Sequence, residues 1–207
     1  MNKCVIIGGG TFNHISCHLS LAAPAFGTTA MQLGHFMKRN HPELECVVTL
    51  TRMADRKSKL VTNKDLLEYV SDILEDPLVK IIVLNAAICD FEIENPSEET
   101  RLSSKQDYPV IMKGITSKII GGIKELRPDI VVCGFKTTHG ATETEQFKKA
   151  MNSMNSNSLN LVLANDVATK ENILISDSGN SYFDTRESLL KKMLSIAVSK
   201  VNVSSKS

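Results

Sequence analysis

The feature that most constrains the fold is a regular alternation of short apolar runs with longer amphipathic segments. The apolar runs are rich in Val, Ile and Leu, and the segments between them have the length of helices. Runs of this kind are typical of strands buried on both faces, which occur in parallel sheets covered by helices. The sequence therefore predicts an α/β fold, a Rossmann-like three-layer domain with a mainly parallel sheet. The predicted strands are Lys3–Ile7, Glu45–Leu50, Lys80–Asn85, Asp129–Phe135 and Leu159–Ala164.

The remaining segments complete this plan. A hairpin is predicted around Ser178-Gly179-Asn180, and Asn63 is expected to be the N-cap of the second helix. The polar segment Asn95–Gln106 interrupts the alternation and predicts a flap beside a site. We expect one domain over residues 1–200 and a flexible tail over 201–207. The predicted helices are Thr29–Asn40, Asn63–Glu75, Ile115–Leu126, Thr142–Met154 and Thr185–Lys200.

Composition excludes several classes of partner. The formal net charge is +1, which favours neither nucleic acid nor an anionic membrane. No apolar run approaches the ~20 residues of a membrane span, and the first apolar run lacks a signal-peptide pattern. No two cysteines form a CxxC pair, so a structural zinc site is not expected. These features predict a cytoplasmic protein that binds neither nucleic acid nor membrane.

Glycines follow the first predicted strand directly. Gly9, Gly10 and Thr11 lie where backbone amides can approach a phosphate. The dinucleotide fingerprint G-x-G-x-x-G is incomplete, because Asn13 stands at its last position. We therefore predict that this segment, read as a loop, cradles a phosphate or a mononucleotide. A tight turn that merely needs glycine is the alternative.

Small and polar residues also follow the third, fourth and fifth predicted strands. In open α/β sheets, ligands bind in the crevice outside the carboxyl ends of the strands. Asp90 is a candidate to hold a cation, and helix capping or turn chemistry is the alternative at the fourth and fifth strands. The residues predicted to bind a ligand there are Asn85, Ala86, Ala87, Asp90, Phe91, Phe135, Lys136, Asn165 and Asp166.

Taken in chain order, these motifs resemble the phosphopantothenoylcysteine synthetase (phosphopantothenate–cysteine ligase) family. The matching pieces are GGT at Gly9–Thr11, NAAICDF at Asn85–Phe91, GFKTT at Gly134–Thr138 and ANDV at Ala164–Val167. The resemblance covers nearly the whole chain and implies a member without the flavoprotein decarboxylase domain that precedes the synthetase in many bacteria.

The resemblance implies a Rossmann-like fold with a flap, and a homodimer. It also implies the joining of 4′-phosphopantothenate to cysteine in coenzyme A biosynthesis, through an acyl-nucleotidylate. CTP or ATP would be the co-substrate, Mg²⁺ the cofactor, and a nucleotide and a small carboxylic acid the partners.

The chain departs from the family pattern after GGT. The family has a stretch like I-S-N-x-S-S-G-K, and an ungapped alignment puts Ala23 at its Asn, Gly27 at its Gly and Thr28 at its Lys. The family Asn contacts the acyl intermediate, and Ala23 has no donor to replace it. The nearest candidates in sequence to stand in as catalytic residues are Asn13, His14 and His18.

The flap and the fourth helix depart as well. The family motif K-I-K-x aligns with Arg101-Leu102-Ser103-Ser104-Lys105, which makes Arg101 and Lys105 candidates for substrate contacts. Two family lysines ahead of ANDV meet the triphosphate; Lys148 or Lys149 can supply one, and Asn157 stands at the other position. We include Gly27 and Lys149 among the predicted nucleotide-binding residues.

His14 and His18 leave several roles open. A helix would put them on one face, where they could bind a metal. A substrate-phosphate contact, a general base or an ordinary loop position are the alternatives. With these departures from the family pattern, two functions stay open. The first is a ligase-like enzyme. The second is a nucleotide-binding sensor, sequestering protein or hydrolase that kept the fold but lost ligation.

Overall fold

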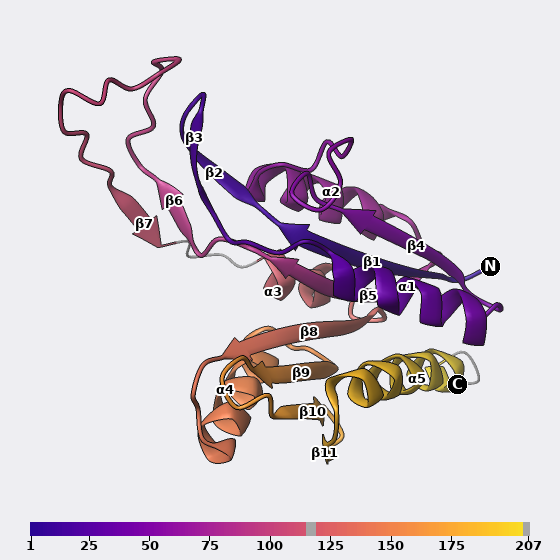
Figure 1. Cartoon of the computed structure of the whole chain (residues 1–207). Helices are drawn as coiled ribbons and strands as arrows, with labels where there is room; N and C mark the ends of the chain where they lie inside the picture. Colours follow the sequence, from indigo (N-terminus) through magenta and orange to yellow (C-terminus); the bar gives the residue numbers. More distant parts are fainter. Residues whose placement is uncertain (115–118, 205–207) are drawn as a thin grey trace.

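A seven-stranded sheet forms the centre of the protein (Figure 1). The computed structural model describes residues 1–114 and 119–204. The strand order is β11-β10-β9-β8-β5-β1-β4. Strands β4, β1, β5, β8 and β9 run parallel, and β10 and β11 add an antiparallel hairpin at one edge. The bounds are β1 Lys3–Gly10, β4 Glu45–Leu50, β5 Val79–Ala87, β8 Val131–Thr138, β9 Leu161–Asp166, β10 Asn172–Ser176 and β11 Ser181–Phe183.

Helices cover both faces of this sheet. Because successive strand residues point to opposite faces, Ile6 packs into the core beneath α1 and α5, whereas Val5 and Ile7 pack into the core beneath α2, α3 and α4. This arrangement confirms the predicted three-layer Rossmann-like fold, and every predicted strand and helix has a counterpart. The helices are α1 Thr28–Asn40, α2 Asn63–Glu75, α3 Ile119–Leu126, α4 Glu143–Ser156 and α5 Arg186–Ser204.

Some boundaries differ from the prediction. Asn63 is not the N-cap of α2; Thr62 is, because its side chain accepts a hydrogen bond from the Asp65 amide and the Asp65 carboxylate accepts one from the Thr62 amide. Helix α5 continues to Ser204, into the predicted tail. The predicted start of α3 at 115–118 and the last tail residues, 205–207, lie outside the described part of the chain.

Two β-hairpin arms extend from the end of the sheet (Figure 1). The first consists of β2 (Phe12–Ser16) and β3 (Leu19–Ala22), where the sequence had predicted a loop. The second consists of β6 (Phe91–Ile93) and β7 (Met112–Gly114), with the flap loop 94–111 between them. The Ser97 amide donates to the Ile15 carbonyl at 2.7 Å, which joins the flap loop to the first arm.

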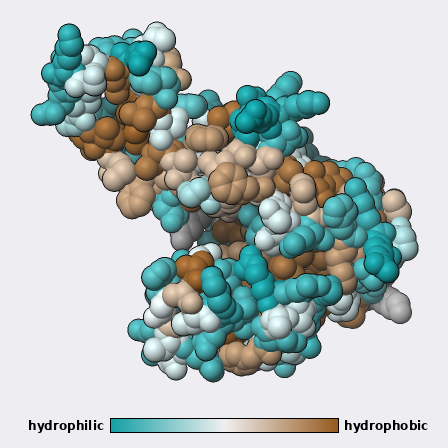
Figure 2. All heavy atoms as spheres, in the orientation of Figure 1, coloured by the Kyte–Doolittle hydropathy of each residue, from teal (hydrophilic) through white to brown (hydrophobic). Residues whose placement is uncertain are grey.

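The second arm exposes apolar side chains. Phe91, Ile111 and Met112 are all exposed there, and Figure 2 shows apolar atoms gathered on the projecting part of the molecule. Among the described residues, no helix is long and apolar enough to cross a membrane.

Candidate functional site

The strand order creates a crevice at the carboxyl edge of the sheet. From β1 the chain first adds β4 on one side and then β5 on the other, so connections diverge between β1 and β5. Ligands of open α/β sheets bind at such points of divergence. Because β1, β5, β8 and β9 are parallel, Gly10, Asn85, Phe135 and Asn165 lie toward the same edge, as the sequence predicted.

A cavity of about 550 Å³ opens at this edge. Its volume is in the range of small-molecule sites, ~300–1,000 Å³. Its walls come from the ends of β5, β8 and β9, from the segment before α1, and from α1, α3, α4 and α5. The sequence-predicted residues that line it are Gly27, Asn85, Ala86, Ala87, Asp90, Phe135, Lys136 and Asn165.

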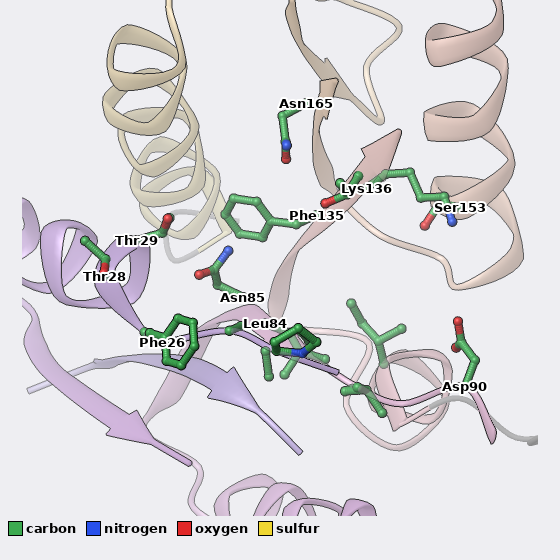
Figure 3. A pocket seen from close by; sticks show the side chains of 18 of the residues that line it. Phe26, Thr28, Thr29, Leu84, Asn85, Asp90, Phe135, Lys136, Ser153 and Asn165 are labelled. Atoms are coloured by element: carbon green, nitrogen blue, oxygen red, sulfur yellow. The ribbon is translucent and has the colours of Figure 1, made fainter. Parts of the chain in front are cut away.

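The side chains that line the cavity form two groups, one on each side of Phe135 (Figure 3). The Phe135 ring lies in the middle, with the Asn85 amide beside it. Thr28 and Thr29, in the first turn of α1, lie on one side of the ring. Lys136, Ser153 and Asp90 lie on the other side. The cavity thus presents an aromatic face and an amide between two polar ends.

Helix α1 points its amino end into the cavity. Gly27 precedes it with φ 74°, a left-handed conformation that favours glycine, and a Cβ there would lie 2.8 Å from the Ala54 Cβ. No side chain caps this helix, and its first turn contains no acidic residue. The positive end of the helix dipole therefore faces the cavity, and no acidic residue of the helix's own first turn neutralises it.

Among the residues that the structure describes, two cationic side chains and one carboxylate line the cavity: Lys136, Arg186 and Asp90. Arg186 is half-buried, and burial lowers the pKa of its guanidinium. One of its amino groups lies 3.4 Å from the Thr29 hydroxyl. The lining therefore carries more positive than negative charge, which favours an anionic ligand.

The predicted glycine cradle is built differently. Gly9 and Gly10 belong to β1 and not to a loop, and they do not line the cavity. A Cβ on Gly10 would lie 2.0 Å from the Ala23 carbonyl oxygen, so this glycine permits the segment before α1 to pass against β1. Thr11 is buried, where its hydroxyl donates to the Asn63 side chain at 2.6 Å. Gly9 and Gly10 pair with Ala86 and Ala87, which line the cavity, so the three residues lie beside the lining and not in it.

Asp166, Phe91 and Lys149 also lie outside the cavity lining. Lys149 is exposed on α4, and Phe91 is exposed on β6. Asp166 is buried at the end of β9. Desolvation raises its pKa, but hydrogen bonds from the Thr169 and Ala141 amides outweigh this and hold the pKa well below its usual range.

The predicted catalytic residues lie on the two arms and do not line the cavity. The Asn13 amide donates to the Phe91 carbonyl, and the His14 ring lies 2.8 Å from the Ser20 hydroxyl. His18 donates from Nδ1 to the Thr100 carbonyl at 2.7 Å, which ties the first arm to the flap loop. Arg101 and Lys105 are exposed on that loop.

The helix that would have put His14 and His18 on one face does not form. His14 lies in β2, and His18 lies in the turn that follows. Within residues 1–114 and 119–204, no group of three or more His, Cys, Asp and Glu side chains could hold a metal ion. The structure therefore does not support a histidine metal site on this arm.

Sequence reasoning missed several lining residues. Ser153 lies on α4 and lines the cavity, and Asn157, the C-cap residue of α4, lines it as well. The sequence had placed Asn157 at the position of a family lysine that meets the triphosphate, whereas Ser153 was not considered. The spacing of four residues between Ser153 and Asn157 was the signal that could have pointed to Ser153. Arg186 gives no comparable signal, because only the fold brings the first residue of α5 beside Thr29.

Comparisons with known proteins agree with this architecture. The family described as "DNA/pantothenate metabolism flavoprotein C-terminal domain" matches residues 2–205. A curated protein named "Coenzyme A biosynthesis bifunctional protein CoaBC", from Methanocaldococcus jannaschii, is 25% identical over 170 residues, which cover 81% of this chain and 41% of that protein. Its namesake from Thermococcus kodakarensis is 29% identical over 112 residues, 54% of this chain and 27% of that protein. The matched part of the chain thus spans less than half the length of both relatives.

Solved structures share the fold at low sequence identity. The DNA/pantothenate metabolism flavoprotein from Streptococcus pneumoniae superposes with a TM-score of 0.81 at 19% identity, over 96% of this chain and 99% of that one. A Cab2 variant in complex with phosphopantothenate-cysteine superposes with a TM-score of 0.68 at 13% identity, over 99% of this chain and 89% of that one.

Proposed function

Because the chain belongs to the family of the DNA/pantothenate metabolism flavoprotein C-terminal domain, we propose that it is a ligase of coenzyme A biosynthesis that joins 4′-phosphopantothenate to cysteine. The observation that carries the proposal is the cavity, where residues of the resembling motifs around Asn85, Phe135 and Asn165 meet. Two curated relatives are named as coenzyme A biosynthesis proteins. The resemblance to phosphopantothenoylcysteine synthetase is confirmed by the family match.

The lining supports a nucleotide co-substrate, CTP or ATP. The Phe135 ring offers a flat apolar surface in the middle of the cavity, and the Asn85 and Asn165 amides offer donors and acceptors. Lys136 brings a positive charge suited to a phosphate. The aromatic face and the amides suit the base of a nucleotide, and the cation suits its phosphates.

Magnesium fits the cavity as an ion carried by the nucleotide. Mg²⁺ is usually held by one or two carboxylates together with substrate phosphates and water. Asp90 is an exposed carboxylate of the cavity lining, and Lys136 lies on the same side of Phe135. Bound Mg²⁺ would neutralise triphosphate charge and stabilise the departing pyrophosphate.

A second function, nucleotide binding without ligation, has one observation in its favour. Asn13, His14, His18, Arg101 and Lys105 all lie on the arms, outside the cavity lining. A ligase must hold an acid and a nucleotide together, whereas a sensor, sequestering protein or hydrolase needs only the nucleotide. A homodimer and a cytoplasmic location remain predictions of the resemblance and the composition.

Pyrophosphate release separates the two functions. We expect that CTP or ATP with Mg²⁺ gives pyrophosphate only when 4′-phosphopantothenate is added, and that adding cysteine gives 4′-phosphopantothenoylcysteine, detected by mass spectrometry. Losing one donor to a reacting group typically lowers a rate ~10²–10³-fold, so the missing donor at Ala23 predicts slow ligation. Nucleotide binding without any acid-dependent release would overturn the ligase proposal and favour the second function.

A pair of lysine substitutions tests the assigned cavity. Lys136→Gln removes a cation from the lining and should weaken nucleotide binding about tenfold or more, the effect of a charged hydrogen bond. Lys64→Gln removes the same charge from α2, where the side chain is 83% exposed, and should leave binding unchanged. Equal effects of the two substitutions would show that the nucleotide binds elsewhere.

A further inference from the structure

Arg186 is a cation that lines the cavity and has no carboxylate partner among the residues that the structure describes. It is the first residue of α5, half-buried, and part of the cavity lining. Its hydrogen-bond partner is the neutral Thr29 hydroxyl, at the long distance of 3.4 Å. None of the ion pairs among residues 1–114 and 119–204 includes Arg186.

The nearby carboxylates of its own segment are engaged elsewhere. Asp184 accepts hydrogen bonds from the Thr185 amide and the Ser188 hydroxyl at the start of α5. Glu187 forms an ion pair with Lys191 at 2.6 Å. Carboxylates therefore surround Arg186 in sequence, yet none of them neutralises its guanidinium.

A half-buried arginine has lost part of its hydration in the free protein. Taking a charge out of water is unfavourable unless a counter-charge and hydrogen bonds replace the lost hydration. Burial lowers the pKa of the Arg186 guanidinium, although arginine stays protonated at neutral pH. A ligand anion entering the cavity would supply the missing counter-charge.

The surroundings of Arg186 favour the same sign of ligand. Thr29 belongs to the first turn of α1, whose uncapped amino end faces the cavity without an acidic residue. Asp90, the carboxylate of the lining, lies on the far side of the Phe135 ring from Thr28 and Thr29 (Figure 3). The Arg186 end of the cavity is thus positive, and separate from the end that holds Lys136 and Asp90.

We propose that Arg186, together with the Thr29 hydroxyl, forms a subsite for a phosphate group, distinct from the Lys136 and Asp90 end of the cavity. The planar guanidinium can donate two parallel hydrogen bonds to phosphate oxygens, which a lysine cannot do. The inference rests on the proposed function in one respect: the phosphate belongs either to the nucleotide or to the phosphorylated acid. It makes Arg186 a binding residue that distinguishes phosphorylated from unphosphorylated ligands.

Two ligand series distinguish the source of the phosphate. Calorimetry with the full chain would compare CTP, CMP and cytidine in one series, with ATP, AMP and adenosine in parallel, and 4′-phosphopantothenate with pantothenate in the other. Arg186→Gln should weaken binding of the phosphorylated members of one series about 10- to 100-fold, the effect expected for a part-buried charged hydrogen bond. Binding of the unphosphorylated member should stay the same. Arg186→Lys keeps the positive charge but loses the paired N–H donors of the guanidinium, so this variant should retain only part of the affinity for the phosphorylated ligand.

Lys191→Gln is the matched control, because it removes one positive charge from α5 outside this cavity. A second measurement needs no variant: the ligand that uses the subsite should protect Arg186, but not the exposed Arg39 and Arg56, from modification by phenylglyoxal. This readout remains available should Arg186→Gln fail to fold.

Each outcome decides the question. Unchanged affinity of Arg186→Gln, or no protection of Arg186 by a ligand that binds, overturns the subsite while leaving the proposed function intact. A wild-type protein that binds none of the phosphorylated probes overturns both. Selective loss in the nucleotide series assigns the subsite to the nucleotide, and selective loss in the acid series assigns it to the phosphorylated acid.

Discussion

Asp166 connects the turn after β8 to the turn after β9. Its carboxylate accepts a hydrogen bond from the Thr138 hydroxyl at 2.8 Å, and others from the backbone amides of both turns. The amide donors belong to Gly140, Ala141, Ala168 and Thr169. These bonds require the ionised form, so they hold the pKa of Asp166 well below its usual range.

The stability that Asp166 contributes should depend on pH. A carboxylate whose pKa is lower in the folded than in the unfolded state stabilises the fold above its unfolded pKa, about 4. This contribution disappears as the pH falls toward the folded pKa. Asp166→Asn should therefore lower the melting temperature clearly at pH 7, and the difference from wild type should shrink below about pH 4.

Thermal unfolding monitored by circular dichroism from pH 7 to pH 3 would measure this difference. Asp107→Asn, on the exposed flap loop, is the control and should behave as wild type at each pH. A melting difference for Asp166→Asn that is constant across this range would contradict the role of its ionised form.

Asn165 and Asp166 show where sequence reasoning about single residues ends. Both were predicted to bind the ligand, because both follow the apolar run of β9. Adjacent strand residues point in opposite directions, so Asn165 reaches the cavity while Asp166 is buried in the neighbouring turns. The sequence predicted that both residues lie at the end of β9, but only the fold shows that one side chain lines the cavity and the other binds the neighbouring turns.

At the scale of elements, the starts of α2 and α4 were predicted to within one residue where the capping signal is local, although the cap of α2 was assigned to Asn63 instead of Thr62. Thr142 caps α4: its hydroxyl accepts from the Glu145 amide, and the Glu145 carboxylate accepts from the Thr142 amide. Such a box satisfies two backbone donors that the helix itself leaves free. Because four consecutive residues contain all of it, α4 begins within one residue of its predicted start.

Thr142→Ala removes half of this capping box. We expect the free energy of unfolding to fall by about 1 kcal/mol, the usual effect of losing an N-cap hydroxyl. Urea denaturation would measure the change. Thr142→Ser keeps the hydroxyl and should remain close to wild type; an equal loss in both variants would show that the methyl group, and not the cap, stabilises this turn.

The first arm was not predictable in the same way. Its strands β2 and β3 are short, and no Asn-Gly or Asp-Gly turn marks the hairpin at Cys17-His18. The arm is held in place by contacts with residues distant in sequence, such as the hydrogen bond from His18 to the Thr100 carbonyl at 2.7 Å. Elements held by long-range contacts leave little trace in a local pattern.

For the whole molecule, hydrophobic patterning predicted the layers, and the rule for strand ends predicted where the cavity lies. Both follow from burial, which the chain shows locally. The complete lining did not follow, because Arg186 and Ser153 reach the cavity from helices whose placement depends on the sheet order. The glycines of β1 were predicted to contact a phosphate, whereas the structure shows that Gly10 permits close packing against the segment before α1.

Nucleotide binding should stabilise the whole fold. The cavity is formed by six or more separate segments, so the unfolded chain has no equivalent site. A ligand that binds only the folded state adds RT ln(1 + [L]/Kd), about 2.7 kcal/mol at a hundredfold excess over Kd. CTP or ATP with Mg²⁺ should therefore raise the melting temperature by several degrees, roughly 2–4 °C per kcal/mol for a chain of this size.

Differential scanning fluorimetry with each nucleotide, with and without Mg²⁺, would measure this shift. Asp90→Asn removes the carboxylate of the cavity lining and should diminish the Mg²⁺-dependent part of the shift, leaving the metal-free part in place. Mg²⁺ alone, without nucleotide, is the control and should have little effect, because a single carboxylate holds Mg²⁺ weakly without phosphate ligands. If no nucleotide shifts the melting temperature at millimolar concentration, the cavity is not a nucleotide site, and the ligase proposal loses its co-substrate.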